Sequence, residues 1–490
     1  RLQAAATRCQ VFLQAIPQPV SHPLSLGMAV LAMQVGAVCA PSLIPRTQCS
    51  SFKARRSVAG NLKGRGQFTA LPPLKLRRAR ELAIGPAQQT TRSKALTVCQ
   101  AAAIEATPAV SPVKAIVVAI QLAVVNTYLN IFGRFETGIR LLVDLVFPSK
   151  IKNIFEGLFQ CYKEQVAIGN NGDMKIASKK TSAVFREMIR AYAGQMLGTP
   201  YEFPSYHTAI REPIDYYKLG NDYVGTLVDY QRSVLGNAHH WDDIQKKIDA
   251  GENVIFFANH QSEADAAFIP LLTQKTHPGL GEKVVYLAGD RVVSDLMSKP
   301  FSMGRNLLCI HSKKHMAADD STTKSKKMRA NIKTLKEMEK LLKAGGTLLW
   351  IAPSGGRDRK SADGVLSPDP FDPDSIELMK KFGTKKGVKK TTFYPMAMAT
   401  YDVMPPPVSV GGDIGEKRIV NYTGCGISLG DPIDVTENGD WAKGVAEDDY
   451  KQALAEYTFE KVSAEYSMIC GCMGTGDGFE TPISCTRPWL

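Results

Sequence analysis

Residues 253–272 read N-V-I-F-F-A-N-H-Q-S-E-A-D-A-A-F-I-P-L-L, and this stretch decides the expected fold. Its apolar run, 254–258, is rich in β-branched and aromatic residues, which is the pattern of a buried strand. The run stops at polar residues that include His260, and Asp265 follows five residues later. Because open α/β sheets bind ligands beyond the carboxyl ends of their strands, the pattern predicts a functional site here.

Strand-like and helical segments alternate on both sides of this stretch. The predicted strands are 254–258, 284–288, 306–310, 347–352, 393–399 and 418–428. Before the fourth of them, one apolar face predicts a helix that Ser321 caps and Gly345-Gly346 ends. The residues of that face are Met328, Ile332, Leu335, Met338, Leu341 and Leu342. A second helix is predicted over 449–468, and strands separated by helices indicate an α/β fold with a large, mainly parallel sheet.

The chain divides into three regions by composition. Residues 1–105 are expected to be a disordered leader and transit peptide, and 106–203 a small all-α domain with helices over 151–168 and 174–197. Residues 204–490 form the expected α/β catalytic domain. The apolar segment 114–133 is interrupted by polar residues, which favours a buried or interfacial helix over a membrane span of about twenty apolar residues.

The formal net charge of +13 is confined to the start of the chain. Residues 1–100 contain 14 Lys or Arg and one acidic residue, whereas the remainder contains 46 of each sign. This balance argues against a nucleic-acid partner. A basic, acid-poor segment rich in Ala and Ser is typical of an organelle transit peptide, and the alternative is a basic tail with no targeting role.

The ten cysteines lack the spacing of a disulfide framework or of paired metal-binding knuckles. Reduced thiols and no metal site are therefore expected. Cys470 and Cys472, with Cys485 nearby, remain open as a redox or metal-binding pair.

His260 and Asp265 have the residue types of an acid–base pair. A histidine can take a proton from a hydroxyl near neutral pH when a carboxylate on its other ring nitrogen fixes the tautomer. The alternative is a histidine that only caps the following helix. The H-x-x-x-x-D spacing at a strand end favours catalysis.

Two cationic clusters follow other predicted strands. One is Ser312-Lys313-Lys314-His315, and the other is the segment 354–360, which contains Arg357 and Arg359. Both clusters are predicted to lie at the same sheet edge as His260, where they could hold a phosphate through charge-assisted hydrogen bonds. Residues 380–390 are also basic, and either a solvated loop or attraction of an acidic protein would explain them.

The N-H-Q-S-E-A-D motif resembles the H-x-x-x-x-D signature of the glycerolipid acyltransferases. The segments A-I-R-E-P-I-D-Y-Y (209–217), K-P-F-S-M-G-R-N-L (299–307), S-K-K-H-M (312–316) and W-I-A-P-S-G-G-R-D-R (350–359) are similar to the soluble plastid glycerol-3-phosphate acyltransferases. This resemblance implies acyl transfer from acyl carrier protein to the sn-1 hydroxyl of glycerol 3-phosphate in the plastid stroma. A membrane-associated lysophosphatidate acyltransferase and a non-catalytic lipid-binding protein are the alternatives.

The resemblance also implies roles for particular residues. His260 and Asp265 are the expected catalytic pair, and Lys314, His315, Arg357 and Arg359 take the phosphate-binding positions. The acyl thioester is a co-substrate, and no cofactor is expected. A monomer with weak contact to a membrane surface is the expected state.

Overall fold

The computed structural model describes residues 112–146, 149–312, 316, 319–406, 418–473 and 485–490. The predicted transit peptide, residues 1–105, lies outside this set. The described residues from Val118 to Leu490 form one compact unit. The predicted domain boundaries at 105 and 203 stay predictions.

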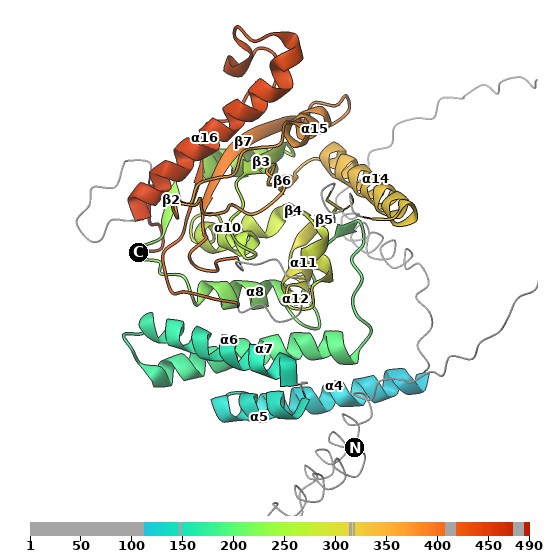
Figure 1. Ribbon diagram of the computed structural model, residues 1–490, viewed down its shortest axis with the longest axis vertical. Helices are drawn as coiled ribbons and strands as arrows, with labels where there is room; N and C mark the ends of the chain where they lie inside the picture. The colour runs from blue at the N-terminus through green and yellow to red at the C-terminus, as the bar shows by residue number, and fades with distance from the viewer. Residues whose placement is uncertain (1–111, 147–148, 313–315, 317–318, 407–417, 474–484) are drawn as a thin grey trace, which may run out of the picture. The chain divides into compact units, whose positions relative to one another are not determined.

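A nine-stranded sheet in the order β1-β5-β4-β6-β3-β7-β8-β2-β9 organises this unit (Figure 1). The five strands β5, β4, β6, β3 and β7 are parallel to one another, and β1, β8 and β9 add antiparallel pairings. The strands are β1 (Tyr206–His207), β2 (Val234–Gly236), β3 (Asn253–Ala258), β4 (Val284–Ala288), β5 (Asn306–Cys309), β6 (Leu348–Ile351), β7 (Thr391–Ala399), β8 (Gly426–Leu429) and β9 (Cys485–Thr486). The predicted α/β fold with a mainly parallel sheet is confirmed.

The predicted strand over 418–428 is wrong except at its end, because β8 begins only at Gly426. The backbone before β8 bonds to loops rather than to a neighbouring strand. Asn421 N donates to Val403 O at 2.9 Å, and Thr423 N donates to Leu227 O at 3.2 Å. The start of this segment carries Arg418, whose side chain pairs with carboxylates of other loops.

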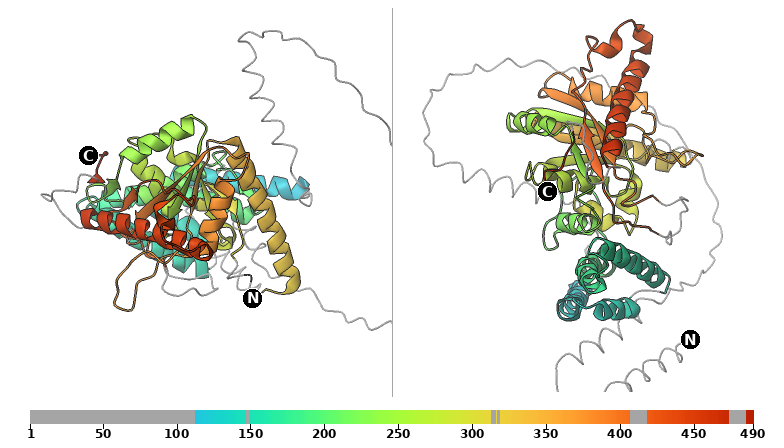
Figure 2. Two further views of the ribbon diagram at one scale, coloured as in Figure 1. Left: turned by 90° about the horizontal axis from the view of Figure 1, so that it is seen from above. Right: turned by 90° about the vertical axis from the view of Figure 1, so that its left-hand side faces the viewer.

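Alternate residues of β3 face two hydrophobic cores on opposite sides of the sheet. Phe256 packs in the core that also contains helices α8 and α10, whereas Phe257 packs in the core that contains α14, α15 and α16. These helices cover the two faces in Figures 1 and 2. The helices of this part are α8 (Tyr216–Gly225), α9 (His239–Asp249), α10 (Asp265–Thr273), α11 (Asp290–Ser294), α12 (Lys299–Met303), α14 (Ser321–Ala344), α15 (Pro373–Gly383) and α16 (Tyr450–Met473), with 3₁₀ turns η1 (Gly281–Lys283), η2 (Asp440–Ala442) and η3 (Glu447–Asp449).

Within the described residues, four helices precede the first strand: α4 (Pro112–Phe132), α5 (Glu136–Val146), α6 (Ser149–Ile168) and α7 (Met174–Leu197). The last two confirm the predicted helices, and Asp173 caps α7 by accepting from Lys175 N and Ile176 N. Aromatic hydroxyls join this layer to the rest of the core. Tyr162 donates to Tyr223 O and Tyr192 donates to Met297 O, each at 2.7 Å.

Helix α14 confirms the predicted helix but differs at its start. Asp320 is the N-cap, because its carboxylate accepts from Thr322 N and Thr323 N, so the predicted cap at Ser321 is wrong. Gly345 ends the helix with a positive φ of 85°, a conformation that glycine adopts at little cost. Of the predicted apolar face, Met338 and Leu342 are buried, whereas Met328 and Ile332 are 51% and 52% exposed.

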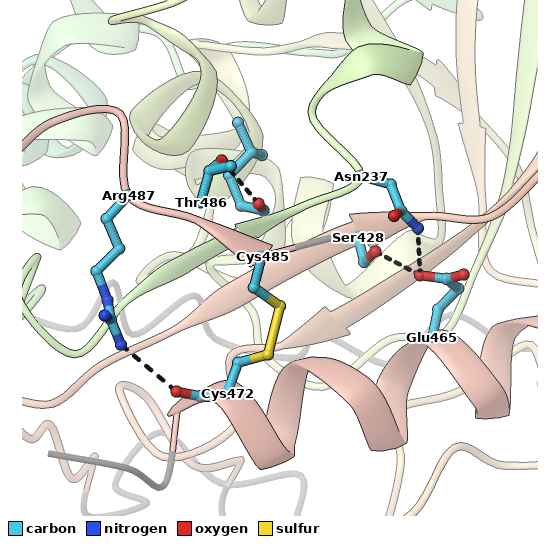
Figure 3. Close-up of a disulfide and its surroundings, with 8 residues drawn as sticks. Asn237, Ser428, Glu465, Cys472, Cys485, Thr486 and Arg487 are labelled. Carbon is cyan, nitrogen blue, oxygen red and sulfur yellow. Dashed lines mark hydrogen bonds between the residues drawn. A yellow bond between two sulfur atoms is a disulfide. The ribbon is translucent and has the colours of Figure 1, made fainter. Parts of the chain in front are cut away.

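Helix α16 ends beside the last strand, and a disulfide joins Cys472 of the helix to Cys485 of β9 (Figure 3). The expectation of reduced thiols is therefore wrong for this pair, since spacing along the chain does not show that β9 returns to the end of α16. Further bonds hold the same segment. Thr486 Oγ1 donates to Leu235 O at 3.0 Å, and Arg487 Nη2 donates to Cys472 O at 3.5 Å.

Candidate active site

Strand β3 carries the candidate catalytic residues to the carboxyl edge of the sheet. It lies between β6 and β7, so the residues that follow it are surrounded by loops from both neighbours. Asn259 fixes the chain as it leaves the strand, because its side chain donates to Met398 O at 3.0 Å and accepts from Met398 N at 2.7 Å. Gln261 Oε1 accepts in the same way from Thr400 N at 2.9 Å.

His260 and Asp265 are in contact, as the sequence predicted. His260 Nδ1 lies 2.7 Å from Asp265 Oδ2. A carboxylate here accepts a hydrogen bond from Nδ1–H, so the neutral ring keeps its proton on Nδ1 and Nε2 is free to act as a base. The pair therefore has the geometry that general-base chemistry requires.

Three further donors hold the Asp265 carboxylate. Asp265 is buried at the first residue of α10, and it accepts from Gln261 N at 2.8 Å, Ser262 N at 3.1 Å and Thr400 Oγ1 at 2.6 Å. The amino end of a helix also favours a negative charge. Asp265 thus fixes both the turn that leads into α10 and the ring of His260. The N-cap Ala264 has no side-chain capping bond, so the alternative of a histidine that only caps this helix is not supported.

The ring of His260 is supported on one side and open on another. It forms a T-shaped contact with the ring of Trp350 in β6, with ring centroids 5.7 Å apart and an interplanar angle of 80°. The His260 side chain is 27% exposed, whereas that of Asp265 is 4% exposed. His260 is therefore accessible from solvent, whereas Asp265 is not.

Asp358 is a buried residue of the site that the sequence analysis did not single out. Its backbone N–H donates to His260 O at 2.6 Å, and its carboxylate accepts from Asn259 Nδ2 at 2.8 Å and from Asp369 N at 3.1 Å. Burial raises the pKa of the Asp358 carboxyl to about 6. Asp358 links the loop after β6 to Asn259 and to the backbone of His260.

Arg357 belongs to a network of alternating charges. Its Nη1 donates to Glu263 Oε1 at 3.0 Å, and Arg418 Nη1 donates to Glu263 Oε2 at 2.7 Å. Arg418 Nη2 also donates to Asp295 at 3.0 Å. The structure therefore brings Arg357 to the same motif as His260. The sequence did not point to a role for Glu263 or Arg418. Glu263 lies within the N-H-Q-S-E-A-D motif, whereas Arg418 follows it by 155 residues and belongs to no recognisable motif.

The structure describes only one of the three remaining residues that are predicted to bind phosphate. Lys314 and His315 lie outside the described residues. Arg359 is exposed in the loop after β6, two residues beyond Arg357. The phosphate-binding role of all four cations stays a prediction.

Ser262 is not positioned as a nucleophile. It is fully buried, and its hydroxyl donates to Met404 O at 3.2 Å and accepts from Ala264 N at 3.1 Å. A covalent acyl-enzyme through this residue would need both bonds to break, so the geometry favours direct attack by a substrate hydroxyl.

The chain is similar in sequence to known acyltransferases. A family model described as "Acyltransferase" matches residues 241–399, the range from α9 to the end of β7. The chain is 39% identical over 351 residues to "Glycerol-3-phosphate acyltransferase, chloroplastic" of Arabidopsis thaliana, which covers 70% of this chain and 74% of that protein.

Two other relatives carry the same name. The protein of Spinacia oleracea is 39% identical over 349 residues, covering 70% of this chain and 72% of its own length. That of Pisum sativum is 37% identical over 377 residues, covering 74% of this chain and 79% of its own length. The similarity extends well beyond the range of the family model.

Proposed function

This chain belongs to the chloroplastic glycerol-3-phosphate acyltransferase family, and on that premise we propose that it moves an acyl group from acyl carrier protein to the sn-1 hydroxyl of glycerol 3-phosphate. It is an acyltransferase of the plastid. The observation that carries the proposal is the His260–Asp265 pair at the carboxyl end of β3, with Arg357 attached to the same motif.

The proposed reaction is a direct transfer. His260 Nε2 removes the proton from the acceptor hydroxyl as that oxygen attacks the thioester carbonyl. The carbon–sulfur bond then breaks, and the departing thiolate takes the proton from the imidazolium, which Asp265 stabilises. General-base assistance of this kind contributes about 10²–10⁴ in rate.

The acceptor phosphate is held, in this proposal, by Arg357, Arg359, Lys314 and His315. Charge-assisted bonds to a phosphate each contribute roughly 1.5–3 kcal/mol. The bond from Arg357 to Glu263 fixes the guanidinium before the substrate arrives. A phosphate held in place makes the hydroxyl a positioned reactant beside His260 rather than a freely diffusing one.

Three further proposals concern the enzyme as a whole. The acyl thioester supplies all the activated chemistry, so the reaction proceeds without a metal or a bound cofactor. The enzyme acts as a monomer, and it touches the membrane surface only weakly. Full activity of the purified chain after treatment with a chelator would test the first of these.

The decisive experiment supplies the purified chain with glycerol 3-phosphate and four donors: palmitoyl and oleoyl thioesters, each on carrier protein and on coenzyme A. We expect higher kcat/KM with the carrier-protein donors and a 1-acyl product, identified by NMR. A 2-acyl product, or a preference for coenzyme A, would contradict the proposal. Efficient use of 1-acylglycerol 3-phosphate as acceptor would instead indicate a lysophosphatidate acyltransferase.

A further inference from the structure

The first two thirds of α14 carry positive charge only. Residues 321–336 read S-T-T-K-S-K-K-M-R-A-N-I-K-T-L-K and contain six Lys or Arg and no acidic residue. The acidic residues of the helix, Glu337 and Glu339, come after this segment and pair with lysines of their own neighbourhood. This part of the helix therefore carries charge of one sign, unlike the mixed charges usual on a solvated helix.

Most of these cations are exposed and form no ion pair with a described residue. Lys324, Lys326, Arg329 and Lys333 are exposed, and none forms an ion pair with any residue that the structure describes. Lys327 differs, because its Nζ lies 2.8 Å from Asp319 Oδ2. The exposed group leaves its charge available to a partner.

Two apolar side chains lie among these cations. Met328 and Ile332, one helical turn apart, are 51% and 52% exposed. Farther along the same helix, Met338 and Leu342 are almost fully buried. Apolar side chains surrounded by charge are the arrangement of a protein-docking surface, in which an apolar centre is rimmed by polar groups. We call residues 324–333 of α14 the basic face.

The basic face lies at the catalytic edge of the sheet. Thr334 Oγ1 donates to Cys309 O at 2.6 Å, and Asn331 exchanges hydrogen bonds with the backbone of His311, so the middle of α14 is fixed to the carboxyl end of β5. Because β5 is parallel to β3, this is the edge at which His260 lies. Figure 1 shows α14 beside β5, and a helix rises about 1.5 Å per residue, so the ten residues before Asn331 reach about 15 Å from that attachment.

The basic segment 380–390 differs in both position and pairing. It precedes β7, whose first residue pairs with Asn253 at the start of β3, so it lies at the opposite edge of the sheet. Lys385 and Lys390 pair with Glu339 and Glu252. Of the two basic segments, only the basic face of α14 combines free charge, exposed apolar side chains and proximity to the site.

We propose that the basic face of α14 is the docking surface for the acyl carrier protein that delivers the donor thioester. The inference rests on the proposed function, because it takes the carrier protein as the donor. The partner must present an acidic surface with apolar side chains at its centre, to match the lysines and Met328 with Ile332. Docking at this edge brings a flexible thioester arm to the side of the sheet from which His260 is accessible.

The test compares two double charge reversals in the full chain. K326E/K333E changes the basic face, and K386E/K389E is the matched control, because Lys386 and Lys389 are also exposed. For K326E/K333E we expect the KM for the carrier-protein donor to rise about tenfold or more. The kinetic constants with the coenzyme A thioester, and the KM for glycerol 3-phosphate, should be unchanged in both variants. M328S/I332S should raise the same KM without altering how that KM depends on salt concentration, because this variant removes apolar contacts and no charge.

Each contrary result has a distinct meaning. Unchanged carrier-protein kinetics in K326E/K333E, or an equal loss in the K386E/K389E control, would overturn the docking surface while leaving the donor proposal intact. An equal loss with the coenzyme A thioester would assign these lysines to the fold or the reaction instead. No turnover of carrier-protein thioesters by the unaltered enzyme would overturn both proposals. Binding to anionic vesicles that K326E/K333E abolishes, with donor kinetics unchanged, would assign the face to a membrane.

Discussion

At the scale of single residues, the proposed reaction depends on His260, whose side chain we expect can be removed with little cost to the fold. It is partly exposed, and its bond to Asp265 is replaceable by water. We expect His260→Ala to reduce kcat by at least about 10²–10⁴, because the acceptor hydroxyl loses its base. Steady-state turnover measures the loss, and thermal unfolding of the variant serves as the control. Retained activity in a folded variant would remove His260 as the base.

Arg357 tests the proposed phosphate contact. Loss of one charge-assisted bond of roughly 1.5–3 kcal/mol predicts that Arg357→Ala raises the KM for glycerol 3-phosphate by about 10- to 100-fold. The KM for the acyl donor should stay nearly unchanged. Glu263→Gln is the informative companion, since it weakens the orientation of Arg357 and should give a smaller change in the same constant. Equal effects on both substrates would argue against a phosphate role.

Asp358 predicts a pH dependence of stability. Its pKa is about 6 in the folded protein and 3.8 in an unfolded chain, so the folded state binds more protons between these values. Its contribution to stability is therefore full below pH 3.8 and is lost as the pH rises to about 6. Relative to wild type, Asp358→Asn should gain up to about 3 kcal/mol between pH 4 and pH 7. Urea unfolding at each pH measures this difference, and a constant difference would contradict it.

The residues of the site differ in how far the sequence reveals them. His260 and Asp265 share a short motif at a strand end, and Arg357 follows a second recognisable strand. Thr400 and Arg418 were missed because they reach Asp265 and Glu263 from segments 135 and 155 residues away. Contacts of that separation depend on how loops pass over the sheet edge, which no local pattern specifies.

At the scale of elements, buried strands were the easiest to predict and segment ends the hardest. β4 matches its predicted range residue for residue, because both faces of a central parallel strand are apolar. The segment before β8 was misassigned as strand because Val420 and Cys425 are buried without lying in a strand. The predicted apolar face of α14 is core only in part, since Met338 and Leu342 are buried whereas Met328 and Ile332 are exposed.

The disulfide between α16 and β9 is expected to stabilise the folded protein. It joins residues 13 positions apart and so restricts the unfolded chain. For a loop of this size, the restriction raises the free energy of unfolding by roughly 3 kcal/mol. Under oxidising conditions we expect Cys485→Ser to lose up to about that amount in a denaturant titration. Cys470→Ser, at a free thiol two residues before Cys472, is the control. With a reducing agent, wild type and Cys485→Ser should become equal; a difference that persists would point to packing rather than the bond.

At the scale of the whole molecule, helix α4 is the element whose apolar surface is least explained by the fold. Its segment Ala115–Phe132 is long and apolar enough to cross a membrane by length and composition, yet only 17% of it is buried. Ile116 and Ile120 are 60% and 51% exposed. An apolar helix that lies on a lipid surface gains free energy from this area, roughly 25 cal/mol per Å² removed from water.

We therefore expect the enzyme to bind weakly to lipid through α4. A chain that begins at residue 106 should bind phosphatidylglycerol vesicles in a flotation assay, and Ile116→Ser with Ile120→Ser should reduce the bound fraction several-fold. Turnover without vesicles should be equal in the two forms, because neither side chain belongs to the catalytic site. Equal vesicle binding would exclude this surface as the contact. Turnover that appears only with lipid or detergent would instead identify α4 as a membrane anchor that the reaction requires, because the enzyme would then be active only when lipid or detergent contacts the apolar surface of α4.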